Sequence, residues 1–264
     1  MTRSFTLIEL LVVIIIIGII VSTLSFNFSP NQLELAADQI IKDIRLTQSL
    51  ALKDDKYQPF PNHICDNTIE GKIECNRSKY WFKQWWQIRF STYNKNGVTY
   101  YWYEIFSDQP YKTQRQNFDG TAHLPKVDWD ISIAKDPLTK KYLIGECDEN
   151  GTDFPICNKI DNNLNLTKTF GIKKIEYQNI SPRHDILFDN FGNVFVRGSN
   201  YKDKGDINPL DKDKRELLTK TAKIILCNKI KNNKCLKDKK HCIAIEISPT
   251  GSLEKTTCNI IGKQ

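Results

Sequence analysis

The sequence lacks the short motifs that mark common enzymes and nucleotide-binding proteins. It has no Gly-x-Ser-x-Gly, no His-Glu-x-x-His, no phosphate-binding glycine loop and no dinucleotide fingerprint. Its few histidines are scattered without the spacing of metal ligands, at His63, His123, His184 and His241. Two of them lie near cysteines, Cys65 and Cys242, but disulfide bonding is the better interpretation of those cysteines. We therefore expect no enzyme activity, no metal site and no cofactor.

The sequence also lacks a Cys-x-x-Cys pair, although it contains eight cysteines. An even number of cysteines in an exported domain indicates disulfides and an oxidising compartment. Short connecting loops favour neighbouring partners, which gives the pairs Cys65–Cys75, Cys147–Cys157, Cys227–Cys235 and Cys242–Cys258. The last four cysteines have an alternative pairing, Cys227–Cys242 with Cys235–Cys258, and the sequence leaves that choice open.

A strong excess of one charge is absent from most of the chain. The formal net charge of the 264 residues is +7, which is mildly basic and does not by itself imply nucleic acid. The exception is Asn228–His241, here called the lysine loop, in which one acid, Asp238, stands against Lys229, Lys231, Lys234, Lys237, Lys239 and Lys240. One hypothesis is that this loop binds the phosphates of double-stranded DNA. The other is a solvated loop that keeps the domain soluble.

The N-terminal segment contains an unbroken apolar run from Leu10 to Val21. Phe5–Phe26 is long enough for a helix to cross a bilayer core of about 30 Å. The four residues before Phe5 are too few for an ordinary secretory signal, and no small-residue cleavage site follows the run. Glu9 is an isolated carboxylate inside the apolar segment, where a charge is costly and indicates a function. Arg3 favours a cytoplasmic N-terminus.

The motif Phe5-Thr6-Leu7-Ile8-Glu9-Leu10 resembles the N-terminal motif of type IV pilins and type II secretion pseudopilins. In that family a prepilin peptidase cuts just before the Phe and methylates the new amine. The resemblance implies cleavage between Ser4 and Phe5, although the family usually has Gly at the position of Ser4. The family's Glu, four residues after the Phe, matches Glu9 and implies a role in filament assembly.

The segment after the apolar run predicts a second helical stretch. Ser29-Pro30-Asn31-Gln32 has the pattern of a helix N-terminus, so a helix either restarts or kinks there. From Asn31 to about Lys53 one apolar face repeats at helical spacing, with Lys42, Asp43 and Arg45 toward the other side. We expect this face to pack on a sheet, which is also the architecture that the resemblance implies.

The remaining segments predict strands and loops. The strongest pattern is a hairpin, Trp85–Ser91 and Val98–Ile105, around the turn Asn94–Gly97. Four of the five tryptophans lie in Trp81–Trp102, where core packing is favoured over a platform for stacked bases. Shorter strands are predicted in Lys126–Ala134, Lys141–Ile144 and Gly171–Tyr177. The polar loop Asp148–Asp153 lacks the full calcium-loop spacing, so a loop closed by a disulfide is preferred.

Two later segments, Ile186–Val194 and Ile243–Leu253, resemble the strand–turn–strand units of GspH/FimT-like minor pseudopilins. Some FimT-like relatives are DNA receptors, and the resemblance puts the lysine loop between the corresponding strands. The expected fold class is α+β, a pilin fold whose long N-terminal helix packs on antiparallel sheet stapled by disulfides. Its expected parts are a leader (1–4), a transmembrane half-helix (5–26), a periplasmic half-helix (27–56) and a β-rich head (57–264).

The expected function is structural. The resemblance implies a minor pseudopilin or pilin-like subunit of a type II secretion or DNA-uptake filament, in the inner membrane with its head in the periplasm. The expected partners are other pilins or pseudopilins, prepilin peptidase, an inner-membrane assembly platform and membrane lipid. The main alternative is a receptor for double-stranded DNA in natural transformation; an adhesin head is weaker.

Overall fold

The structure, a computed structural model, describes residues 7–24, 31–54, 84–107, 133–146, 157–180, 184–197 and 215–258. The chain divides into two compact units, Met1–Asn31 and Gln32–Gln264, and each is described by itself. The first unit contains helix α1 (Leu7–Leu24). Exposed apolar side chains from Leu7 to Ile17 occur all round this helix, which is typical of a helix that does not pack against a single protein surface.

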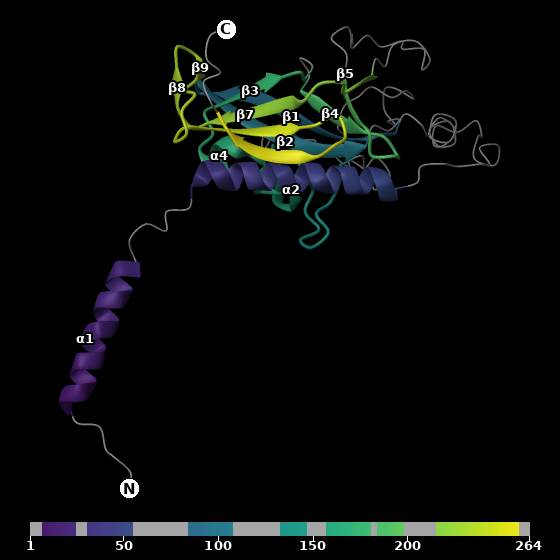
Figure 1. Ribbon diagram of the computed structural model, residues 1–264. Coiled ribbons are helices and arrows are strands. Elements are labelled where there is room, and N and C mark those ends of the chain that lie inside the picture. Colours follow the sequence, from purple (N-terminus) through teal and green to yellow (C-terminus); the bar gives the residue numbers. More distant parts are fainter. Residues whose placement is uncertain are drawn as a thin grey trace. The chain divides into compact units, whose positions relative to one another are not determined.

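Helix α2 (Gln32–Lys53) begins the second unit (Figure 1). The predicted apolar face is confirmed, because the buried residues of α2 follow helical spacing: Leu33, Ala36, Ala37, Ile40, Ile44, Thr47 and Ala51. Ser29 and Pro30 of the predicted capping pattern lie outside the described residues.

The prediction was wrong for Asp43, which is only 1% exposed rather than on the solvent side. The hydroxyl of Tyr103 donates to Asp43 Oδ2 at 2.6 Å, and Nε2 of Gln39 donates to the same oxygen at 2.9 Å. These donors make burial of a carboxylate possible. Burial still dominates and raises the pKa of Asp43, while the hydrogen bonds from Tyr103 and Gln39 oppose it.

The first sheet has five antiparallel strands in the order β2-β1-β4-β5-β6. They are β1 (Trp86–Lys95), β2 (Val98–Ser107), β4 (Asp185–Phe188), β5 (Val194–Arg197) and β6 (Arg215–Leu217). The predicted hairpin is confirmed as β1–β2, and its loop has only two residues, Asn96 and Gly97. Both have positive φ, 53° and 76°, as the tight turn of a two-residue hairpin requires.

The second sheet has four antiparallel strands in the order β11-β10-β7-β3. They are β3 (Lys174–Gln178), β7 (Ala222–Cys227), β10 (Cys242–Ile247) and β11 (Leu253–Thr257). The strand predicted in Gly171–Tyr177 is therefore present as β3. Helix α2 packs on both sheets, on β1 and β4 of the first and on β10 and β7 of the second (Figure 1). The main core lies between them and includes Ile40, Ile44, Phe90 and Ile245.

The predicted strands around residues 126–134 and 141–144 are not formed in the described residues. Instead Ile133 and Ile144 make single bridges to β2, opposite Phe106 and Glu104. The chain turns between them because Asp136 Oδ1 accepts hydrogen bonds from the amides of Leu138 and Thr139. Short helices follow, at η3 (Cys157–Lys159), η4 (Asn162–Leu164) and α4 (Leu166–Phe170). These segments cover β2 and build a second, smaller core around Phe106 and Tyr142.

Candidate functional site

The N-terminal helix carries the first candidate site. Glu9 lies in the first turn of α1, while Ser4 and Phe5 lie outside the described residues. Large apolar side chains from Leu7 to Ile17 are 46–83% exposed, so α1 presents an apolar surface. None of the helices in the described part of the chain has both the length and the hydropathy that a membrane crossing requires.

The lysine loop is the second candidate site, and its first half folds as a small hairpin. Strands β8 (Ile230–Lys231) and β9 (Lys234–Cys235) pair antiparallel around a two-residue turn. The turn residues Asn232 and Asn233 both have positive φ, 50° and 56°, a conformation that asparagine tolerates better than most residues. The sequence therefore specifies a defined hairpin here, not an extended tail.

Contacts from β3 fix this hairpin to the second sheet. The amide of Cys235 donates to Glu176 Oε1 at 2.8 Å, and Lys237 Nζ lies 3.7 Å from Glu176 Oε2. Nζ of Lys174 donates to the backbone oxygen of Asn233 at 2.6 Å. Sequence reasoning missed Lys174 and Glu176, because nothing in the local pattern of β3 indicates pairing with a loop near the other end of the chain.

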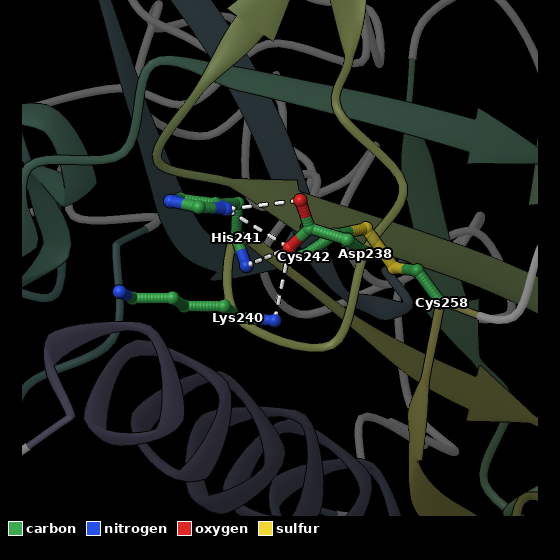
Figure 2. A network of polar contacts seen from close by, with 5 residues as sticks. All are labelled: Asp238, Lys240, His241, Cys242 and Cys258. Atoms are coloured by element: carbon green, nitrogen blue, oxygen red, sulfur yellow. Dashed lines mark hydrogen bonds and ion pairs between the residues drawn. A yellow bond between two sulfur atoms is a disulfide. The ribbon is translucent and has the colours of Figure 1, made fainter.

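The second half of the lysine loop is held by Asp238 (Figure 2). Its Oδ1 accepts hydrogen bonds from the amides of Lys240 at 3.0 Å and His241 at 2.8 Å. The ring Nδ1 of His241 lies 2.9 Å from the same oxygen. The contact with His241 is the main cause that lowers the pKa of Asp238, so the turn is held by a carboxylate. Asp238, the one acid of the lysine loop, therefore forms these hydrogen bonds with residues of the loop itself.

Two disulfides close the base of the lysine loop. The structure has the neighbour pairs Cys227–Cys235 and Cys242–Cys258, and not the crossed alternative. Cys227 and Cys242 are opposite each other on β7 and β10, so the four cysteines form one buried cluster with Ile225 and Ala244.

The other predicted disulfides involve residues outside the described part of the chain. Cys157 is disulfide-bonded, but its predicted partner Cys147 is not described. The predicted pair Cys65 and Cys75 also lies outside the described residues.

The loop lysines are presented to solvent. All six are exposed, namely Lys229, Lys231, Lys234, Lys237, Lys239 and Lys240. Lys237 is the one with an ion pair to Glu176. Several lysine ammonium groups held in an ordered loop can bind phosphates or other anions. Lysine lacks the planar, bidentate donors that read DNA bases.

The other sites considered from the sequence receive no support as ligand sites. Within the described residues there is no group of three or more His, Cys, Asp or Glu side chains suited to a metal ion. His184 stacks on Tyr177 with ring centroids 3.8 Å apart, and His241 contacts Asp238. His63, His123 and the loop Asp148–Asp153 lie outside the described residues.

The described tryptophans of the hairpin region are packed in the protein. Trp86 donates to Asp54 Oδ2 at 2.8 Å, and Trp102 packs against the smaller core. The ring of Trp85 lies 4.6 Å from that of Phe195, with the Arg215 guanidinium 4.3 Å from its centre. These contacts favour the packing interpretation over a platform for bases; Trp81 lies outside the described residues.

Comparison with known protein families gives a match at the N-terminus. Residues 1–25 match the family described as the prokaryotic N-terminal methylation motif. No curated protein and no solved structure matches the chain. An apolar N-terminal helix with Glu9 in its first turn, followed by an α+β unit with disulfides, is the layout of a pilin-like subunit. The methylation motif at residues 1–25 supports a type IV pilin or pseudopilin as the class of this chain.

Proposed function

We propose that this chain is a minor, GspH/FimT-like subunit of a pilus-like filament that serves type II secretion or DNA uptake. The observation that carries the proposal is the methylation motif at residues 1–25, which begins a helix with one early carboxylate. In this proposal the apolar segment Phe5–Phe26, which extends beyond the described α1 at both ends, anchors the chain in the inner membrane with its N-terminus cytoplasmic, and the disulfide-containing unit faces the periplasm. The two strand–turn–strand units, β4–β5 and β10–β11, support the GspH/FimT-like assignment.

Processing is the first step of this function. Prepilin peptidase cuts between Ser4 and Phe5 and methylates the amine of Phe5. Intact-mass spectrometry of the protein extracted from membranes tests this step. The expected mass is that of a chain beginning at N-methylated Phe5, and a chain that still begins at Met1 contradicts the proposal.

Assembly depends on Glu9. A carboxylate in an apolar surrounding costs free energy unless it is paired, and the processed amine of Phe5 on a neighbouring subunit is the proposed partner. Glu9→Ala should leave the head folded and impair incorporation into filaments. Glu34→Ala is the matched control, because Glu34 is an exposed acid in the first turn of α2. Normal assembly of the Glu9 variant contradicts this role.

The second candidate function is a receptor for double-stranded DNA. The observation that favours it is the lysine loop, whose charges are exposed on a hairpin fixed by a disulfide and by β3. Each lysine that neutralises a phosphate releases counterions, so binding falls steeply with salt. The absence of arginine from this loop predicts binding without base reading.

A titration of the full chain in mild detergent with labelled duplex at low and moderate salt tests this candidate. The variant replaces Lys229, Lys231, Lys234 and Lys239 by Ala and keeps Lys237, because Lys237 contacts Glu176. It should bind more weakly and lower the slope of log affinity against log salt by about 3. No binding by the wild-type chain at low salt, or equal binding by the variant, removes the receptor function and leaves the scaffold function.

A further inference from the structure

The position of the lysine loop on the second unit follows from two contacts along α2. A Cβ on Gly251, just before β11, would lie 2.7 Å from Nε2 of Gln48. Further along β11, Nζ of Lys255 lies 2.8 Å from Oδ1 of Asp38. As β11 proceeds from Gly251 to Lys255, its contacts on α2 move from residue 48 back to residue 38. The strand therefore runs toward the N-terminal end of α2.

The two spacings agree with an alignment of β11 along α2. Four residues of strand cover about 13 Å, and ten residues of helix cover about 15 Å. Continuing from Lys255 to Cys258 adds about 10 Å, which corresponds to six or seven helical residues and reaches the level of Gln32. Cys258 is bonded to Cys242, the residue that directly follows the lysine loop. The lysine loop therefore lies at the end of the head where α2 begins, as Figure 1 also shows for β8 and β9.

From this position we infer that the lysine loop binds the anionic phospholipid headgroups of the membrane in which the chain is anchored. The inference rests on the proposed membrane anchoring of α1. Residues 25–31 join Leu24 to Gln32 and can span at most about 28 Å even when fully extended. The start of α2 can therefore reach the membrane surface, and the lysine loop lies at that same end of the second unit.

Two features of the lysine loop favour a lipid surface over duplex DNA. Ile230 on β8 is 47% exposed among the lysines, and an apolar side chain within a basic cluster suits the boundary between headgroups and acyl chains. Phosphates of a DNA backbone offer no apolar partner to such a residue. In addition, tethering raises the effective concentration of lipid at the loop, so individually weak lysine–phosphate contacts are sufficient.

Lysine footprinting of the full chain in lipid nanodiscs tests the inference. One set of discs contains phosphatidylcholine alone, and the other contains phosphatidylcholine and phosphatidylglycerol in equal parts. An amine-acetylating reagent is added, and the modification of each lysine is followed by mass spectrometry. At low salt, acetylation of Lys231, Lys234 and Lys240 should be slower by roughly fivefold in the anionic discs, and high salt should remove the difference.

The internal controls are Lys53, in the last turn of α2, and Lys220, just before β7. Both are exposed and lie toward the opposite end of α2. Lys53 is in its last turn, and Lys220 is close to Ala222, which pairs with Ile247 just before the turn at Gly251 that lies beside Gln48. Their acetylation should be equal in both discs. Replacing Lys229, Lys231 and Lys234 by Ala should abolish the protection of Lys240, whereas replacing Lys53 and Lys220 by Ala should leave it intact.

The outcomes separate this inference from the proposed function. A chain that enters both discs but shows equal acetylation of the loop lysines overturns the lipid inference alone. Protection of these lysines only when duplex DNA is added also overturns it, and supports the DNA receptor instead. A chain that enters neither disc contradicts the proposed membrane anchoring, and the lipid inference fails with it.

Discussion

Replacing Tyr103 by Phe should destabilise the head because it removes a hydrogen bond from the buried carboxylate of Asp43. The hydroxyl of Tyr103 is 2.6 Å from Asp43 Oδ2, and both residues are almost completely buried. A hydrogen bond to a charged group contributes about 1.5–3 kcal/mol, so Tyr103→Phe should lower the free energy of unfolding at pH 7 by about that amount. Among the described residues, Gln39 is the side-chain donor that still contacts the Asp43 carboxylate.

The assay is denaturant unfolding of the full chain in mild detergent, followed by tryptophan fluorescence with the disulfides intact. Tyr100→Phe is the control, since Tyr100 lies on the same strand and is only half-buried; its effect should be within about 0.5 kcal/mol. In an Asp43→Asn background the Tyr103 hydroxyl meets a neutral acceptor, so Tyr103→Phe should cost only about 1 kcal/mol. Equal costs in the two backgrounds refute the charge-assisted role of this hydrogen bond.

The same pair predicts a dependence on pH. Burial raises the pKa of Asp43 in the folded chain above its value in the unfolded chain. Between these two pKa values the folded state binds more protons, so the stability that this group contributes falls as pH rises through that window. Asp43→Asn removes the titration, and its stability relative to wild type should therefore increase with pH across the window. A constant difference between the two proteins refutes the raised pKa.

Three further predictions concern the head. Arg89→Met should cost about 3–5 kcal/mol in the same assay, because it removes the buried ion pair between Arg89 Nε and Asp185, which are 2.6 Å apart. Gly145→Ala should cost well over 2 kcal/mol, since its Cβ would lie 2.4 Å from the carbonyl carbon of Leu164, whereas Gly97→Ala should cost only about 1 kcal/mol for its left-handed backbone. Non-reducing peptide mapping should give Cys65–Cys75 and Cys147–Cys157, and free thiols at these positions contradict the pairing.

Local pattern was sufficient where the structure depends on neighbouring residues. The β1–β2 hairpin was predictable because Asn96 and Gly97 are suited to positive φ and the flanking segments alternate. The apolar face of α2 was predictable from helical spacing. The bridges Cys227–Cys235 and Cys242–Cys258 were predicted as neighbours because they close short loops.

Features that depend on contacts between distant segments of the chain could not be predicted from the sequence. Asp43 was placed on the solvent side because its donor Tyr103 is 60 residues away in the chain. The order β2-β1-β4-β5-β6 joins a hairpin near residue 100 to strands near residue 190, and no local signal specifies that pairing. Likewise, the support that Lys174 and Glu176 give to the lysine loop became visible only once β3 was placed beside it.

The packing of α2 against β10 has a consequence for how the chain is made. Synthesis delivers α2 before any of the strands, whereas β10, which covers part of its buried face, is among the last segments to appear. Until then the apolar face formed by Leu33, Ile40 and Ile44 has no complete cover, and such faces favour aggregation. Closing so long a loop also costs chain entropy before the contacts between α2 and β10 can form, so this packing forms slowly. Under the proposed anchoring of the N-terminal segment, the membrane would keep these unfinished chains apart during that interval.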